Sequence, residues 1–405
     1  MKIADACGIK PERVGKLARG EGAITTYGKI VTIADGLRIP GRLLGLAPRA
    51  WESNEAHSEA ILGTASMSAL GVGRMGPEYA EGEAMRRREF LAATISAAGS
   101  AADLPVPDRG RVGLADVQRL KERTIRLRRL DDFLGGEHTY PIYARELSST
   151  SALLSRGSYL ESTAQALLGL IAEQAQQAGW AAFDAGRHAE AEQLYRVALR
   201  AATDAHDQPL IGNSLAFLAY QQISTAQSGV ETATASCERA GSDAPPAVRA
   251  LLFERLAWAH AKAAEPKGAE QALAEAEAAV SSAEGDQTGP DWATWVDRRE
   301  VSIMAGRCWA ELGRPLRAVP VLEQALAGFP DARARDKSLY TSWLAHAYLD
   351  AGEVEQAAAV TERCFQLALG VGSVRPHERV TTLLNRLKPY GSMPKVAELM
   401  EYAAV

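Results

Sequence analysis

A frame of small residues recurs in the C-terminal part of the chain and constrains its fold more than any other feature. Each copy places glycine or other small or apolar residues at spacings of 7, 5, 4 and 3. Three copies match closely: Gly179, Gly186, Ala191, Tyr195 and Ala198; Gly306, Gly313, Ala318, Leu322 and Ala325; and Ala345, Gly352, Ala357, Thr361 and Cys364. A turn glycine between two periodic apolar segments predicts two helices that approach each other closely. The frame therefore predicts a series of helical hairpins.

Two weaker copies fill the interval between these matches. One consists of Ala257, Ala264, Ala269, Leu273 and Ala276, with alanine in place of the turn glycine, and the other is a degenerate copy around 212–240. Aromatic residues make up 6% of the chain and hydrophobic residues 47%, a composition poor in strand formers but sufficient for a core. An all-α fold is expected, in which each hairpin buries its apolar face on its neighbours.

These frames resemble tetratricopeptide (TPR) repeats, with offsets longer than the usual ~34 residues. The resemblance implies a TPR-like α-solenoid over 114–405, with about five repeats whose inner helices line a groove. By the register of the repeat, eight residues face that groove: Glu173, Trp180, Asn213, Tyr220, Glu254, Trp258, Arg307 and His346, with Glu300 on a further inward position. Aromatic faces with a few polar groups suit a ligand. The alternative is packing between helices, an open question for the tryptophans and the favoured interpretation for His346.

Charge is distributed unevenly along the chain. Residues 1–130 carry 21 lysines and arginines against 15 aspartates and glutamates, a net charge of +6, whereas the remainder carries 24 against 35, a net charge of −11. Such segregation suggests that the N-terminal part contacts a polyanion and that the rest does not.

The first fifty residues predict a cluster of short helices. The segment IADAC ends at Gly8, a second helix follows from Pro11, and TYGKIVTIADGL carries the apolar stripe of an amphipathic helix. The second helix exposes four basic side chains, Lys10, Arg13, Lys16 and Arg19. A helix, a glycine-containing turn and a basic second helix is the arrangement that enters a DNA major groove.

This segment resembles the Cro-repressor-like (XRE) helix-turn-helix. IADACGIKPERVGKLARG matches the family pattern at Ile3, Ala4, Gly8, Ile9, Val14, Leu17, Arg19 and Gly20. The resemblance implies a DNA-binding domain over 1–50, with Arg13 and Lys16 in the groove and Lys10 and Arg19 on phosphates. The family's first helix has no counterpart after Met1, and Pro11 and Gly15 replace base-reading polar residues. Whether Met1 is the true start is therefore open, and phosphate contact is better supported than sequence readout.

Residues 51–113 read as a linker with a short helix at 84–95. Its RRREFLAATISAAG segment superficially matches a twin-arginine export signal, but such signals are N-terminal, and a docking helix is favoured. The basic stretch 117–130 is expected to be a solvated helix, with contact to nucleic acid as the alternative. Its buried stripe would be Val117, Leu120, Thr124, Leu127 and Leu130.

Signals for catalysis or metal binding are weak. The chain lacks the common phosphate-loop, nucleophile-elbow and zinc-protease motifs, and its seven histidines lack ligand spacing. No catalytic residue, cofactor or metal site is therefore predicted. Carboxylate pairs such as Asp131 and Asp132 are expected to be solvated charges. Four dispersed cysteines and the absence of a long apolar run favour a cytoplasmic protein without membrane contact.

The combination resembles bacterial transcription regulators in which a helix-turn-helix precedes a TPR array. It implies a DNA-binding regulator, not an enzyme, with double-stranded DNA as one partner and a peptide, small-molecule or protein effector in the groove. A homodimer on a two-fold operator is expected. The alternative is a TPR adaptor that binds proteins and not DNA.

Overall fold

The computed structural model describes residues 111–282, 289–369 and 371–403. The chain divides into two units, residues 1–80 and 81–405, and all described residues belong to the second. The proposed DNA-binding domain with Lys10, Arg13, Lys16 and Arg19, and the linker helix at 84–95, lie outside the described residues.

The described part begins with two helices and a short connection. Helix α6 spans Leu114–Arg128 and buries Val117 and Thr124, two residues of the predicted apolar stripe. The 3-10 helix η3 follows at Arg129–Asp132, and α7 spans Gly136–Arg156.

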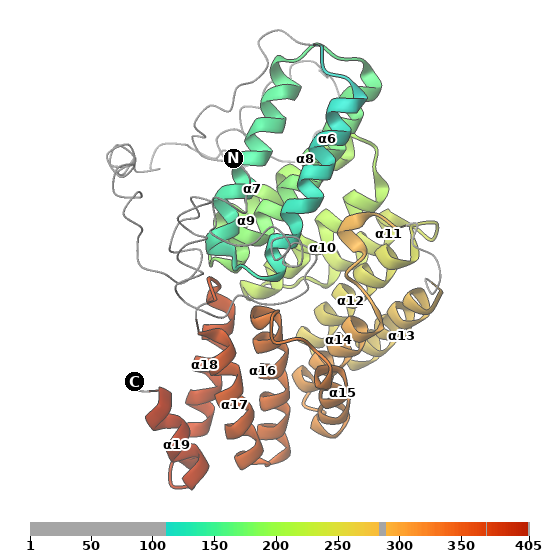
Figure 1. The fold of residues 1–405 in the computed structure, drawn as a ribbon. Coiled ribbons are helices and arrows are strands. Elements are labelled where there is room, and N and C mark those ends of the chain that lie inside the picture. The colour runs from blue at the N-terminus through green and yellow to red at the C-terminus, as the bar shows by residue number, and fades with distance from the viewer. Residues whose placement is uncertain (1–110, 283–288, 370, 404–405) are drawn as a thin grey trace, which may run out of the picture. The chain divides into compact units, whose positions relative to one another are not determined.

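Five helical hairpins follow along the chain (Figure 1). They are α8 (Glu161–Asp184) with α9 (His188–Asp204), α10 (Gln208–Ser224) with α11 (Val230–Ala240), α12 (Pro246–Lys262) with α13 (Pro266–Ser282), α14 (Arg298–Glu311) with α15 (Pro315–Ala327), and α16 (Ala334–Ala351) with α17 (Val354–Ala368). The 3-10 helix η4 (Asp291–Ala293) precedes α14, and α18 (Val374–Leu387), η5 (Lys388–Tyr390) and α19 (Pro394–Ala403) end the described chain. The described residues form no strand, only an isolated bridge between Arg111 and Ser158, so the prediction of an all-α fold is confirmed for them.

The turns between paired helices fall on the predicted frame positions. Gly186, Gly313 and Gly352 have φ of 76°, 63° and 82°, in the left-handed region that glycine adopts without a steric penalty. Ala264, the alanine that replaces glycine in the third hairpin, has a φ of 57°. The same backbone turn is therefore made at a position where the side chain disfavours it.

Close approach explains the small residues on the first helix of a hairpin. A Cβ added to Gly179 of α8 would lie 2.5 Å from Cε1 of Tyr195 on α9, and one added to Gly306 of α14 would lie 2.5 Å from Cγ of Leu322 on α15. Both partners are fully buried. The frame thus encodes a large side chain of the second helix packed directly on the backbone of the first.

Residues near the start of the described chain contact residues near its end. The backbone N–H of Glu137, in the first turn of α7, donates a hydrogen bond to the carbonyl of Gly372, just before α18, at 3.0 Å. Gly135 and Gly372 pack so closely that a Cβ on Gly135 would overlap the Gly372 backbone. The hairpin series therefore brings α7 and α18 together (Figure 1).

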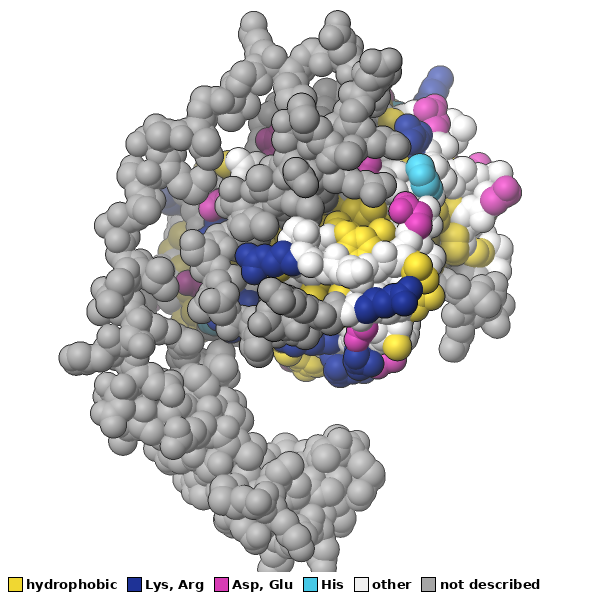
Figure 2. Space-filling model, turned by 90° about the horizontal axis from the view of Figure 1, so that it is seen from above, with side chains coloured by type: hydrophobic (Ala, Val, Ile, Leu, Met, Phe, Trp, Pro, Cys, Tyr) yellow, Lys and Arg dark blue, Asp and Glu magenta, His cyan; other side chains and the backbone are white. Residues whose placement is uncertain are grey.

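The exposed face of Figure 2 mixes side-chain types. Among the described residues on that face, basic, acidic and hydrophobic side chains lie beside one another. A search of the described helices finds none with the length and apolar character needed to cross a bilayer.

Candidate functional site

A cavity of about 370 Å³ lies on the inner side of the hairpin series. The first helix of each hairpin contributes to its wall, through α8, α10, α12, α14 and α16, together with α6, η3, α7, the η4 segment and α18. The second helices α9, α11, α13, α15 and α17 provide none of its described lining residues. The volume is in the range of small-molecule sites.

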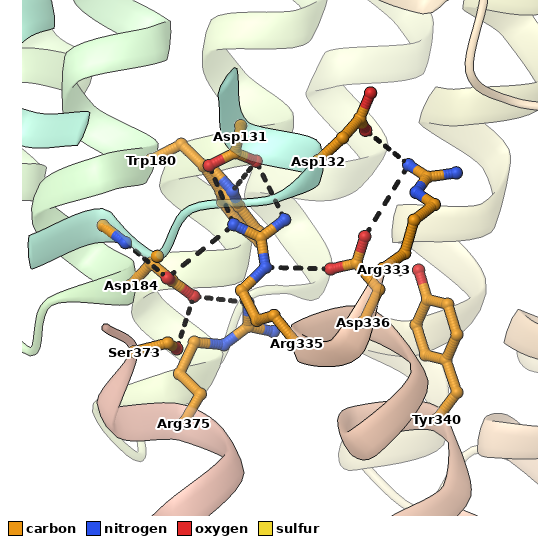
Figure 3. A network of polar contacts seen from close by, with 12 residues as sticks. Asp131, Asp132, Trp180, Asp184, Arg333, Arg335, Asp336, Tyr340, Ser373 and Arg375 are labelled. Atoms are coloured by element: carbon orange, nitrogen blue, oxygen red, sulfur yellow. Dashed lines mark hydrogen bonds and ion pairs between the residues drawn. The ribbon is translucent and has the colours of Figure 1, made fainter. Parts of the chain in front are cut away.

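One wall of the cavity is an aspartate–arginine network, formed by Asp131, Asp132, Asp184, Arg333, Arg335, Asp336 and Ser373 (Figure 3). At its centre, Nη1 and Nη2 of Arg335 donate to the two carboxylate oxygens of Asp131 at 2.8 and 2.9 Å. Its Nε donates to Asp336 at 2.9 Å, and Asp184 lies 3.7 Å from Nη1. The Arg335 side chain is 8% exposed, so three carboxylates surround a guanidinium that is removed from water.

Asp184 links this network to two backbone segments. Its carboxylate accepts hydrogen bonds from the backbone N–H of Gly136 and the hydroxyl of Ser373, both at 2.9 Å. Burial lowers the pKa of Arg335, but the charges of Asp131, Asp336 and Asp184 outweigh burial and raise it well above its usual value. The network of four aspartates and two arginines therefore holds η3, α8, α16 and the start of α18 together through ion pairs and hydrogen bonds.

A second group of arginines surrounds one phenol and is called the Tyr220 cluster: Tyr220, Arg255, Arg307 and Arg375. The Tyr220 hydroxyl oxygen accepts hydrogen bonds from Nη2 of Arg307 at 3.2 Å and from Nη2 of Arg375 at 3.1 Å. The guanidinium of Arg255 lies 5.1 Å from the centre of the Tyr220 ring and 5.7 Å from that of Trp295. Three helices, α12, α14 and α18, thus direct positive charge at one side chain of α10.

These arginines change the acidity of Tyr220. Burial by itself raises the pKa of the phenol, but the charges of Arg375, Arg307 and Arg255 outweigh burial and lower the pKa from 10 to about 7. A phenol with this environment is partly ionised at neutral pH.

Arg307 is the least compensated member of the cluster. Its residue is 6% exposed, and it forms no ion pair with any carboxylate of the described residues. Its guanidinium lies over the rings of Trp258 at 4.7 Å and Trp343 at 5.8 Å, and its Nε has no hydrogen-bond partner within the described chain. Only a phenol oxygen and aromatic faces therefore offset this buried charge.

The other two arginines have weaker carboxylate contacts than Arg335. Nη1 of Arg375 lies 3.3 Å from Oδ1 of Asp184, a member of the aspartate–arginine network. The guanidinium of Arg375 lies 4.8 Å from the centre of the Trp180 ring. Arg255 lies 3.6 Å from its sequence neighbour Glu254. Neither pair has the two-oxygen geometry of Arg335 and Asp131.

The glutamates nearest the cluster are buried, and burial raises the pKa of each. Burial and the charge of Glu254 raise the pKa of Glu300 to about 8, although the hydroxyl of Tyr340 donates to it at 2.6 Å. Burial also raises the pKa of Glu254, which lies 3.6 Å from Arg255 and whose two carboxylate oxygens have no hydrogen-bond partner among the described residues. Because Glu300 is largely protonated at neutral pH, the three arginines around Tyr220 outnumber the carboxylates that balance them.

Five of the eight residues predicted to face a groove line this cavity: Glu173, Trp180, Asn213, Tyr220 and Arg307. Trp258 is not among the lining residues. Its ring packs edge-to-face on that of Trp343, with 5.2 Å between the ring centres, and the guanidinium of Arg307 lies over it. Glu254 is fully buried behind Arg255, and Nε2 of His346 pairs with Asp350 at 3.2 Å. The predicted inward register therefore holds on the first, second and fourth hairpins, whereas the residues predicted on the third and fifth pack or pair outside the lining.

The expectation of solvated charges is wrong for Asp131, whose side chain is 20% exposed, whereas the Asp132 side chain remains 41% exposed. Asp131 binds Arg335 and accepts a hydrogen bond from Nε1 of Trp180 at 3.2 Å, and Asp132 binds Arg333 at 2.7 Å. Sequence reasoning also missed Arg255, Arg335 and Arg375. Of these, Arg375 follows the last predicted repeat, so the repeat register could not place it on the inner face.

Comparisons with known proteins leave the site to be interpreted from its own chemistry. A scan against protein-family models finds no matching family, and a search of curated proteins finds no match. In the described ranges, no group of three or more histidine, cysteine, aspartate or glutamate side chains is arranged to hold a metal ion. What the cavity offers is aromatic surface, amide groups, arginines and carboxylates, and most of the carboxylates pair with arginines of the same lining.

Proposed function

We propose that this chain is a DNA-binding transcription regulator whose helical hairpins form a TPR-like array that binds an effector. The observation that carries the proposal is the cavity, because five inner helices converge on a space large enough for a small molecule or a short peptide segment. The left-handed turn positions and the packing of Tyr195 on Gly179 fit the TPR resemblance of the frame.

The DNA-binding half of the proposal depends on the sequence of residues 1–50. In this interpretation Arg13 and Lys16 enter the groove and Lys10 and Arg19 contact phosphates, in a homodimer on half-sites about one helical turn apart. Effector binding in the cavity would change the affinity of the chain for DNA through a coupling free energy.

The decisive experiment is genome-wide recovery of DNA fragments bound by the full-length chain, followed by titration on a recovered fragment. Combined Lys10→Gln and Arg19→Gln substitutions, which remove the two proposed phosphate contacts, are expected to weaken binding. Each lost phosphate contact should also reduce the slope of log affinity against log salt concentration by about one unit. The matched control is Arg196→Gln, because Arg196 is an exposed arginine on α9 that pairs with Glu192 four residues earlier.

Unchanged affinity and salt slope in the double variant would contradict the assignment of the helix-turn-helix. Failure to recover any DNA fragment would favour the adaptor alternative, in which the array binds proteins only.

A further inference from the structure

The two groups of arginines in the cavity wall differ in what neutralises them. Arg335 is surrounded by Asp131, Asp184 and Asp336, whereas Arg307 has no carboxylate partner among the described residues. A buried guanidinium without a full counter-charge is costly, because several kcal/mol of hydration are lost without a matching ion pair, and for Arg307 the hydrogen-bonded negative charge is that of the partly ionised Tyr220 phenol. Such a group is expected where an anion arrives from outside.

Buried polar atoms without a hydrogen-bond partner also belong to residues of this cavity wall. Asn213 is 3% exposed and lines the cavity; its Nδ2 donates to Gln176 at 2.7 Å, while its Oδ1 has no partner among the described residues. Arg307, also lining the cavity, has an unpartnered Nε. Buried polar atoms are nearly always hydrogen-bonded in folded proteins, so these atoms, together with Nε2 of Gln177 and Nε of Arg333 in the same lining, indicate missing partners: an acceptor for the nitrogens and a donor for Oδ1 of Asn213.

The rest of the wall near Tyr220 is aromatic. Trp180 lies 6.0 Å from Phe217 and 6.1 Å from Tyr220, measured between ring centres, and all three line the cavity. Trp295 adds a partly exposed ring beside Arg255. Flat apolar surface next to guanidinium groups suits a ligand with a planar apolar body and one charged end.

We propose that the cavity binds a small organic anion, a carboxylate or a phosphate ester with a planar apolar body, whose charged group lies beside Tyr220 between Arg255, Arg307 and Arg375. This inference rests on the proposed function in that it names the chemical class of the effector. Arginine binds carboxylates and phosphates through the same planar donor geometry, so the two head groups share one recognition chemistry.

Tyr220 supplies an internal signal for this event. In the free protein the phenol oxygen accepts from Arg307 and Arg375 and is partly ionised near neutral pH. An anion that binds the same arginines places a like charge beside the phenolate, which raises the pKa of Tyr220 and favours the protonated phenol. Binding is therefore accompanied by uptake of a proton onto the Tyr220 oxygen.

The test uses the full chain and five probes: inorganic phosphate, phenyl phosphate, indole-3-acetate, and the neutral analogues phenol and indole-3-acetamide. Calorimetric titration is expected to show that phenyl phosphate or indole-3-acetate binds at least tenfold more tightly than its neutral analogue. The anion with the larger ratio of affinity to that of its own neutral analogue indicates the preferred head group, and inorganic phosphate alone should bind more weakly because it lacks the planar body. Absorbance at the tyrosinate band should fall as the anion binds, and this signal should be absent in Tyr220→Phe.

Three variants separate the site from general charge effects. Arg307→Gln is expected to weaken binding of the anion at least tenfold, and Arg307→Lys, which keeps the charge, should restore part of it. Arg333→Gln, in an arginine that also lines the cavity but pairs with Asp132 and Asp336, should change binding less than threefold. Circular dichroism of each variant verifies that the helices are retained.

Equal binding of an anion and its neutral analogue would overturn the proposal, as would binding unaffected by Arg307→Gln. No binding of any anion with a dissociation constant below about 1 mM would also overturn it. The outcome is separable from that of the proposed function. Anion binding without any effect on DNA affinity would retain the site and remove effector control, whereas a DNA response to a neutral or peptide effector would do the reverse.

Discussion

The aspartate–arginine network and the Tyr220 cluster both place buried arginines in the wall of one cavity, but different groups offset the positive charge in each. Arg335 donates to both oxygens of Asp131 and contacts two further aspartates. Arg307 contacts one phenol and two indole rings. In the first arrangement the aspartates outnumber the arginines, and in the second the arginines outnumber the carboxylates that contact them.

This difference separates a structural role from a binding role. The aspartate–arginine network holds elements together: Asp131 and Arg335 are 204 residues apart, and their bond ties η3 to α16 (Figure 3). An arginine cluster without enough carboxylate partners contributes little to the free energy of folding. Its positive charge instead favours the binding of an anion. The same substitution made in the two regions should therefore have different consequences.

The largest effect is expected for Arg335→Met. Removing the guanidinium leaves Asp131 and the fully buried Asp184 without their shared cation, and loss of one partner from a buried ion pair typically costs about 3–5 kcal/mol. The free energy of unfolding of the full chain, from urea titration followed by circular dichroism, measures it. Arg333→Met is the control, because that side chain is 35% exposed and its ion pairs should contribute only about 0–1 kcal/mol. Equal losses for both variants would show that burial does not distinguish the two arginines.

An intermediate effect is expected for Glu300→Gln, and it should depend on pH. The pKa of Glu300 is raised to about 8, so its contribution to stability is complete below about pH 4.5 and declines as the pH rises through 8. Between these values the free energy of unfolding of the parent chain should fall with a slope of up to about 1.4 kcal/mol per pH unit, and the glutamine variant should lack that component. Glutamine can still accept the hydrogen bond from Tyr340.

The exposed Glu192, which pairs with Arg196 on the surface of α9, provides the matched control. Glu192→Gln should leave the pH slope unchanged. A parallel slope in Glu300→Gln and the parent chain would mean that Glu300 is ionised throughout the range, and the surplus of positive charge around Tyr220 would then be smaller than inferred.

The repeated frame made the hairpins and the inner helices predictable. Spacing alone located the turns at Gly186, Gly313 and Gly352, because a tight turn between antiparallel helices needs a left-handed residue at a fixed position. It also placed Trp180, Tyr220 and Arg307 on the inner helices that line the cavity. Local periodicity determines which face of a helix points inward.

The contacts that distinguish the two arginine groups were not predictable in this way. Periodicity relates each hairpin to its neighbours, whereas the Asp131–Arg335 bond and the Arg375–Tyr220 bond, 155 residues apart, join distant parts of the chain. Sequence also presented Asp131 as an ordinary solvated charge and did not single out Arg335, since charged residues are rarely buried unless they are paired. Only the arrangement of the hairpins in space supplies the pairing.

The smallest effect is expected for Arg307→Met, the same substitution as Arg335→Met in the other region. The variant loses two cation–π contacts and a hydrogen bond to Tyr220, but it also removes a buried charge that has no carboxylate partner among the described residues. These contributions oppose each other, so the free energy of unfolding without ligand should change by no more than about 1 kcal/mol. Urea titration of the two methionine variants side by side gives the comparison directly. A loss near that of Arg335→Met would make Arg307 a structural residue, because its charge would then already be compensated inside the protein and no anion would be needed to complete the site.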